Sequence, residues 1–311
     1  MKRRPVIAML LPLLLTACAH GGAAQRNLSV EVLPSSTPPM LQVYDVRSVA
    51  LITMDAETYT AGVVAGEMPG TWPIEALKAQ AILARTFVLK FITEKESRYP
   101  GADISTDIAE AQAYDAAAVN GRILQAVQET EGLILLGEDD SLPYTWFHAH
   151  SGGQTALARE SLDWQDTEPG YTASLPGGDS PDAPESAKAW AAEFTAEAFL
   201  RACREAGAQP PHCRTVTIGE QGSSGRAVTL LCGGAEVNAA RLRIALGSTV
   251  MRSTLLTELV SDGETVRMAG LGYGHGVGMP QWGAYGMAQA GHTGEEIALH
   301  YYRNLRLVRA W

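Results

Sequence analysis

The chain has 311 residues, and its 24 Lys and Arg against 34 Asp and Glu give a formal charge of −10 at pH 7. Nucleic acid is a poor partner for so acidic a chain, because its binding depends on basic residues that neutralise phosphates. The length suits one elaborate domain or two small ones.

Residues 1–17 have the pattern of a secretory signal peptide. A basic start is followed by an apolar run, Pro5 to Leu15, that is short for a membrane span. Leu15-Thr-Ala-Cys18 resembles a lipobox, so we predict a mature chain that begins at a lipid-bearing Cys18. The alternatives are an ordinary signal peptide with a chance cysteine, or an uncleaved anchor.

The predicted location is the periplasmic face of the cell envelope. Ala19, rather than an aspartate, follows Cys18, which favours the outer membrane in a Gram-negative host. The leader carries three basic and no acidic residues, so the mature charge becomes −13. Residues 18–40 are rich in Gly, Ala, Ser and Pro and predict a flexible tether. The domain is expected to cover residues 41–311.

The first half of that domain predicts strands and helices in mixed order. A strand is expected within Val43–Met54, and Tyr59–Val64 opens an element that leads to Glu67. An apolar stripe with three- and four-residue steps predicts a helix over Pro73–Phe91, capped by Thr71. The remaining expected elements are a helix over Val119–Thr130 and a pair of strands at Leu133–Leu136 and Tyr144–Ala149.

The second half predicts a surface excursion over residues 161–189 and then further short elements. These are a helix over Ala187–Ala206, a hairpin of Arg214–Ile218 with Val228–Cys232, and helices over Ala239–Gly247, Pro280–Ala290 and Gly294–Arg303. No regular βαβ rhythm is present, which favours the α+β class. Three cysteines follow Cys18, and pairing of Cys213 with either Cys203 or Cys232 is allowed.

Glu67 is the first candidate for chemistry. It precedes Met68-Pro69 and Trp72, between an expected strand end and a helix start, where clefts form. Burial beside the indole would raise its pKa toward a value useful for donating a proton, and Trp72 suits the apolar face of a sugar ring. The alternative is that Glu67 only favours the helix N-terminus through the dipole.

A second candidate segment runs from Tyr144 to Gln154. On a strand, Tyr144, Trp146, His148 and His150 would share one face, which is apt for a carbohydrate cleft. The alternative is a set of solvated or hydrogen-bonded strand histidines. No third metal ligand follows nearby, so no metal is expected here.

The third segment has glycine at every second position from Gly270 to Gly278. On an extended chain, this spacing removes one face of side chains and lets a ligand or another backbone approach closely. This segment by itself does not decide between a close approach by a ligand and a close approach by another backbone. The spacing does not match a dinucleotide-binding fingerprint.

Taken in this order, the three segments resemble the SpoIID/LytB family, from about Val43 to Leu307. The residues that carry the resemblance are Gly62-Val-Val-Ala-Gly-Glu67-Met-Pro, Trp72 to Phe87, Gln112-Ala-Tyr114, Phe147-His148 with Ser151-Gly152-Gly153, Ser224-Gly-Arg226, Arg243 before Leu246-Gly247, Arg252-Ser-Thr254, and Gly274-His275-Gly276 through Gln281-Trp282-Gly283.

This resemblance implies a SpoIID-like domain with a glycan-binding cleft and a peptidoglycan lytic transglycosylase activity. The enzyme would cut the bond between N-acetylmuramic acid and N-acetylglucosamine in peptide-stripped strands and leave 1,6-anhydro ends. The family's catalytic glutamate matches Glu67, which would act as the single acid and base. We expect the groove to be lined by Trp72, Tyr144, His148, Ser151, Gly152, His275, Gln281 and Trp282.

No cofactor is expected. Some relatives hold zinc through histidine and cysteine near the segment that matches His148, but that segment has no cysteine here. The expected partners are glycan strands, an N-acetylmuramoyl-L-alanine amidase, and the membrane through the lipid on Cys18. Two rival functions remain: a non-catalytic glycan-binding protein that enhances an amidase, and a structural envelope lipoprotein.

Overall fold

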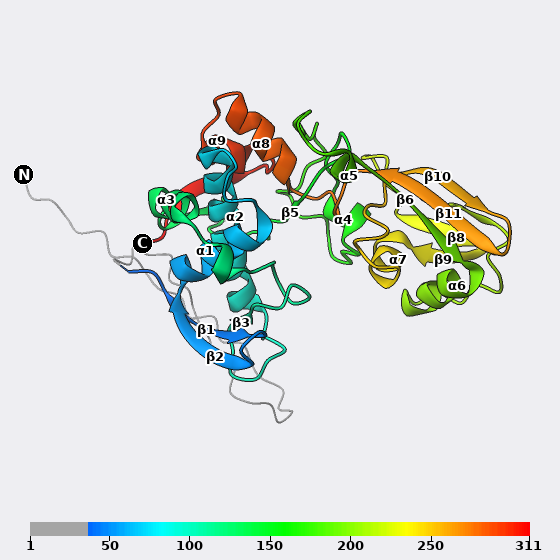
Figure 1. Cartoon of the computed structure of the whole chain (residues 1–311), viewed down its shortest axis with the longest axis horizontal. Helices are drawn as coiled ribbons and strands as arrows, with labels where there is room; N and C mark the ends of the chain where they lie inside the picture. The colour runs from blue at the N-terminus through cyan, green and yellow to red at the C-terminus, as the bar shows by residue number, and fades with distance from the viewer. Residues whose placement is uncertain (1–36) are drawn as a thin grey trace, which may run out of the picture.

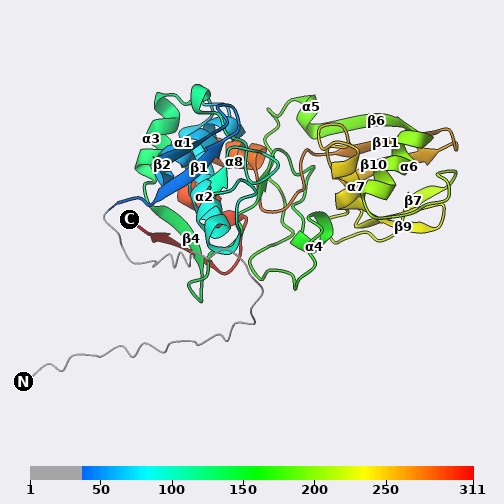
Figure 2. The ribbon, with the colours of Figure 1, turned by 90° about the horizontal axis from the view of Figure 1, so that it is seen from below.

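The structure is a computed structural model that describes residues 37–311. These residues form two lobes, which both views keep apart (Figures 1 and 2). The first lobe contains both ends of the described chain, and the second is built from residues 189–271. The predicted leader, Cys18 and most of the predicted tether lie outside the described residues, so the predicted division of the chain stays a prediction.

The first lobe is arranged around helix α2, which contacts four other helices. A three-stranded sheet in the order β2-β1-β3 lies beside these helices, and β13 pairs antiparallel with β4. The elements of this lobe are β1 (Met40–Asp45), β2 (Ala50–Asp55), α1 (Ala56–Glu67), α2 (Ile74–Glu94), β3 (Ile104–Ser105), η1 (Ala116–Ala118), α3 (Gly121–Glu129), β4 (Leu133–Gly137), α8 (Gln281–Gln289), α9 (Gly294–His300) and β13 (Leu305–Arg309).

Helix α2 matches the predicted helix, but its start differs. Pro73 occupies the cap position without a side-chain hydrogen bond, so the predicted cap at Thr71 is wrong. Thr71 belongs instead to a turn closed by the Trp72 N–H and the Pro69 carbonyl. Further along α2, Arg85 is fully buried and donates to both carboxylate oxygens of Glu57 and to the Leu133 carbonyl. It thus fixes α2 to α1 and β4.

The second lobe has its own apolar core between two three-stranded sheets and two helices. Its elements are β6 (Ala189–Thr195), α6 (Ala196–Glu205), β7 (Val216–Ile218), β8 (Thr229–Cys232), β9 (Ala235–Asn238), α7 (Ala239–Ala245), β10 (Leu256–Ser261) and β11 (Thr265–Leu271). The predicted hairpin and the helix at 239 are confirmed. The predicted helix over 187–206 is wrong in its first part, because Trp190, Ala192 and Phe194 alternate inward along β6.

Two chain segments connect the lobes and lie side by side. The outgoing segment holds β5 (Phe147–His148), α4 (Ala158–Ser161) and α5 (Glu185–Lys188), and the returning segment holds β12 (Met279–Pro280). β5 pairs parallel with β12, and residue bridges join His150 to Tyr273 and Ala156 to Val277. The predicted strands at Leu133–Leu136 and Tyr144–Ala149 correspond to β4 and to the shorter β5, and they belong to different sheets, since β4 pairs with β13.

The mixture of helices and small separate sheets confirms the α+β class. The all-buried Tyr59–Val64 stretch, whose type the sequence left open, is part of helix α1. Within residues 37–311, no helix combines the length and apolar character needed to cross a membrane.

Candidate functional site

Glu67 is the last residue of helix α1. The helix ends there because Pro69 disfavours helical geometry in the residue before it, and Met68 is accordingly extended. The expected place between a strand and a helix start is thus wrong. At the C-terminal end of α1, the helix dipole opposes a negative charge, which removes the alternative that Glu67 serves a helix N-terminus.

Two neutral groups hold the Glu67 carboxyl. The Ala113 N–H donates to Oε1 over 2.8 Å, and the Gln281 side-chain amide donates to Oε2 over 3.1 Å. Burial raises the pKa of Glu67 above its ordinary value, although both hydrogen bonds act to lower it. Neither partner is a carboxylate, so the geometry presents one protonatable acid whose two oxygens are fixed in place.

Two glycines on α1 bring the Ala113 N–H within reach. A Cβ at Gly62 would lie 2.1 Å from the Tyr114 ring, and one at Gly66 would lie 2.7 Å from the Tyr114 nitrogen. The glycine pair therefore lets the segment at 113–115 pack directly on the helix, where the Asp115 N–H donates to the Gly62 carbonyl. Ala113 was not predicted as a site residue, because its contribution is a backbone group that no side-chain pattern reveals.

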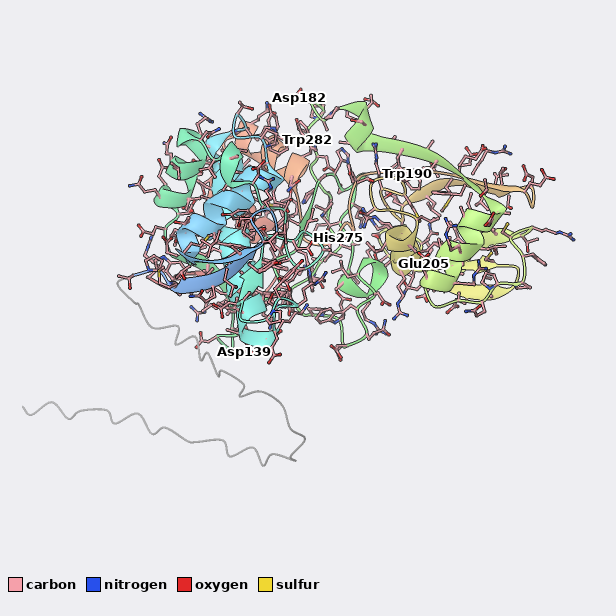
Figure 3. The ribbon with its side chains drawn as sticks, turned by 60° about the horizontal axis from the view of Figure 1, so that its bottom comes forward. Asp139, Asp182, Trp190, Glu205, His275 and Trp282 are labelled. Carbon is pink, nitrogen blue, oxygen red and sulfur yellow. The ribbon has the colours of Figure 1, made fainter. Side chains whose placement is uncertain are left out.

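Three aromatic rings, those of Trp72, Trp282 and Tyr285, pack together at the N-terminal part of α8. Trp72 lies 4.6 Å from Trp282 and 5.1 Å from Tyr285, measured between ring centroids, and all three side chains are half-buried. Trp282 lies at the edge of the first lobe (Figure 3). The structure thus brings together Trp72, Trp282 and, through α8, Gln281, as predicted. Tyr285 was missed, although its place three residues after Trp282 on a predicted helix was a usable signal.

His148 and His275 lie together between the lobes, with ring centroids 5.6 Å apart. Burial, with the charges of Arg243 and Arg226, lowers the pKa of His275 to about 3. Burial also lowers the pKa of His148 well below its ordinary value. Both rings are therefore neutral at pH 7, and neither supplies a positive charge to a ligand. The Nδ1 of His148 lies 3.2 Å from the Val277 carbonyl, while its Nε2 has no hydrogen-bond partner in the described part of the chain.

Ser151 and Gly152 form a tight turn around a carboxylate. The Ser151 hydroxyl and its N–H both donate to Asp179, and the side chain is fully buried. Gly152 has a φ of 75°, and its N–H donates to His150 Nδ1. In this structure the Ser151 side chain is enclosed and positions the turn, and its predicted contact with glycan stays a prediction.

Tyr144 is separated from the Glu67 carboxyl. Its ring is 6 % exposed and packs beside Phe87 and Trp146, with the Lys90 ammonium 5.2 Å from its centroid. Because α2 rises by roughly 1.5 Å per residue, about 24 Å of helix lies between Ile74 and Lys90. The predicted shared face from Tyr144 to His150 is therefore divided between an aromatic cluster and the histidine pair.

The alternating glycines permit another segment of backbone to approach closely, which is the second of the two interpretations that the sequence left open. Gly272, Gly274, Gly276 and Gly278 all have positive φ, so the chain there is not an extended strand. A Cβ at Gly274 would lie 2.5 Å from His148, and one at Gly278 would lie 2.0 Å from the Trp146 carbonyl oxygen. The glycines permit the returning segment to pass against the outgoing one, which sets the position of β12 and hence of Gln281.

Among residues 37–311, no group of three or more His, Cys, Asp or Glu side chains has the geometry of a metal site. The three cysteines there are all buried free thiols. Both predicted disulfide pairings stay predictions, as does the absence of a cofactor.

The α+β fold holds a half-buried glutamate between two uncharged hydrogen-bond donors. The family model described as Stage II sporulation protein, SpoIID, matches residues 44–136. Stage II sporulation protein D of Bacillus subtilis is 28 % identical over 293 residues, which covers 88 % of this chain and 80 % of that protein. The corresponding protein of Bacillus amyloliquefaciens is 29 % identical over 292 residues.

A second kind of relative is the protein named amidase enhancer from Bacillus subtilis. It is 26 % identical over 291 residues, and the match covers 79 % of this chain but 40 % of the longer relative. Together, the family model and these relatives confirm the resemblance to the SpoIID/LytB family that the sequence motifs indicated.

Proposed function

We propose that this protein acts on cell-wall peptidoglycan as a lytic transglycosylase. The observation that carries the proposal is the Glu67 carboxyl, whose pKa is raised by burial and whose two oxygens are fixed by the Ala113 N–H and the Gln281 amide. Trp72, Trp282 and Tyr285 offer aromatic surface beside it, which suits the apolar faces of sugar rings.

The proposed reaction needs one carboxyl group that acts first as a general acid and then as a general base. Neutral Glu67 donates its proton to the glycosidic oxygen as the bond from that oxygen to C1 of N-acetylmuramic acid breaks. The Glu67 carboxylate then takes the proton of the sugar's C6 hydroxyl while O6 closes onto C1. The products are a 1,6-anhydro end and a free hydroxyl on the neighbouring N-acetylglucosamine. A glycosidase that uses water would need a second carboxylate about 5 to 9.5 Å from the first, whereas this route needs Glu67 alone.

Export as a lipoprotein anchored through Cys18, at the periplasmic face, is part of the same proposal. It is supported by the residue pattern of positions 1–18. Such a location would give the protein access to glycan strands. It would also give access to an amidase, a partner whose class is suggested by the name of the amidase enhancer relative.

The second candidate is a glycan-binding protein that enhances an amidase without cutting glycan. It is favoured by the name of that relative. The test is digestion of purified strands, intact and amidase-stripped, with product analysis by mass spectrometry. Anhydro-ended fragments that disappear with Glu67→Gln, but persist with the exposed control Glu236→Gln, support the transglycosylase. A folded protein that binds strands and releases no fragment supports the second candidate.

A further inference from the structure

A pocket of about 610 Å³ lies beside the histidine pair, and the proposed chemistry at Glu67 does not use it. It is formed by the end of α4, by α7 and by His275, which lies between the two lobes (Figure 3). The polar side chains that line it are Ser161, Asp163, Glu205, Arg241, Arg243 and His275. Glu205, at the end of α6, forms an ion pair with Arg201 over 4.0 Å.

The two arginines of this pocket differ in their partners. Arg241 forms an ion pair with Asp163. Arg243 makes no ion pair within residues 37–311, and donates instead to the carbonyl oxygens of Arg252 over 3.0 Å and Ser248 over 3.3 Å. Burial lowers the pKa of Arg243 to about 10, so the guanidinium remains charged at pH 7. Arg243 is therefore a half-buried positive charge without an ion-pair partner among the described residues, an arrangement that favours an anion.

A second, independent feature also points to a ligand. Ser161 lines the pocket, the residue is 5 % exposed, and its buried hydroxyl oxygen has no hydrogen-bond partner among residues 37–311. His275 cannot serve as a competing donor, because its Nδ1 accepts from the Val277 N–H and its ring also bonds the Phe147 backbone. A free hydroxyl and an uncompensated guanidinium together match the needs of a carboxylate, which accepts from both.

We propose that this pocket binds a carboxylate of the glycan, and that Arg243 is the residue that selects for it. This inference rests on the proposed function. A muramic acid whose stem peptide has been removed carries a free lactyl carboxylate, whereas an intact stem replaces this charge with an amide. Recognition by Arg243 would therefore make the protein prefer stripped strands, because an amide in the same place would leave the guanidinium desolvated and unpaired.

The position of the pocket is compatible with a polymer that also reaches Glu67. The chain from His275 to Gln281 spans at most about 22 Å when fully extended. Gln281 bonds Glu67 directly, and β12 pairs with the strand that holds His148. A strand of several sugars can thus contact the carboxyl and the pocket at once, which places the selected muramic acid at a distance from the bond that is cut.

The test compares the affinities of two short sugars for the Glu67→Gln protein, in which the ligand is not cut. One is a peptide-free tetrasaccharide from stripped strands, and the other is chitotetraose, which has no carboxylate. We expect the first to bind at least about tenfold tighter, as a charged hydrogen bond provides. Adding Arg243→Gln should remove this difference and leave chitotetraose binding unchanged, which also reports a folded protein. The matched control Arg267→Gln should retain the difference, because Arg267 is an exposed arginine of the second lobe that does not line the pocket.

Equal affinities for the two sugars, or an equal loss of both with Arg243→Gln, would overturn the inference. A tetrasaccharide with peptide-bearing muramic acid distinguishes the source of the carboxylate: if it binds as tightly as the stripped one, the lactyl group is not what is recognised. If Arg243→Gln does not fold, the NMR signals of His275 in the Glu67→Gln protein test the inference instead. N-acetylmuramic acid should then shift these signals more than N-acetylglucosamine does, and equal shifts would contradict the inference. Binding that is selective for the carboxylate, without cleavage, would contradict only the proposed transglycosylase activity. Cleavage together with equal affinities for the two sugars would contradict only the inference about Arg243.

Discussion

Two glutamates at opposite ends of helix α1 have contrasting surroundings. Glu57, in the first turn, accepts two hydrogen bonds from Arg85, one from the Gly132 N–H and one from the Trp311 indole. Glu67, the last residue, receives only uncharged donors. The helix dipole favours a negative charge at the first and opposes it at the second. The comparison teaches that position on the helix and counter-charge, rather than residue type, separate a structural carboxylate from a candidate acid.

The largest expected effect is the loss of catalysis on substitution of Glu67. Glu67→Gln removes the acid and base while it keeps the shape of the side chain, so the rate of glycan cleavage should fall by roughly 10²- to 10⁴-fold. The rate of release of anhydro-ended fragments measures this, and circular dichroism checks the fold. A folded variant that cuts at the normal rate would exclude Glu67 as the catalytic group.

At Glu57, the same change from glutamate to glutamine should lower stability rather than catalysis. Glu57→Gln leaves the buried Arg85 charge without its partner, which should lower the free energy of unfolding by about 3–5 kcal/mol. Denaturant unfolding measures the loss, with Glu236→Gln on the exposed face of β9 as the control. The cleavage rate per folded molecule should stay near that of the wild type. If stability is unchanged, the ion pair is not what fixes α1 to α2.

A smaller, pH-dependent effect separates the two carboxylates further. The pKa of folded Glu67 lies above the ordinary 4.5. As pH rises from about 4, the unfolded chain ionises first, so wild type should lose stability relative to Glu67→Gln until the folded pKa is passed. The difference between their melting temperatures, followed from about pH 4 to pH 8, measures this. A difference that stays constant or changes in the other direction would contradict a raised pKa.

The smallest expected effect concerns the aromatic rings beside Glu67. Tyr285→Ala removes one ring of the trio, which should weaken glycan binding by roughly two- to tenfold, as aromatic contacts of about 0.5–1.5 kcal/mol provide. Tyr99→Ala is the matched control, because it removes a ring stacked on Tyr44 in a different part of the first lobe. Equal weakening by both substitutions would show that Tyr285 acts through stability rather than through contact.

The sequence revealed the elements with strong local signals. Helices α2, α3, α7, α8 and α9 lie where the pattern predicted, and the Thr293 capping box of α9 is present. Helix α1 was not identified because Tyr59 to Val64 is buried on all sides and carries no amphipathic stripe. Strand β6 was taken for helix because its alanines favour that assignment, whereas its packing follows the inward alternation of Trp190 and Phe194.

The site itself depended on contacts that no local pattern encodes. Glu67, Trp72, Gln281 and Trp282 could be selected as residue types, but the bond from the Ala113 N–H joins segments that are distant in the chain. Ser151 and Tyr144 looked equally suitable, and both are buried in other environments. Burial and partner identity arise from the tertiary fold, so they distinguished these residues only in the structure.

The most direct test of the central claim is digestion of stripped glycan strands in water labelled with ¹⁸O. If Glu67 acts as both acid and base on one sugar, the fragments end in 1,6-anhydro-N-acetylmuramic acid and contain no label, because the sugar's own C6 hydroxyl closes the ring. Labelled reducing ends would show that water attacks instead, which would contradict a mechanism that uses this single carboxyl twice.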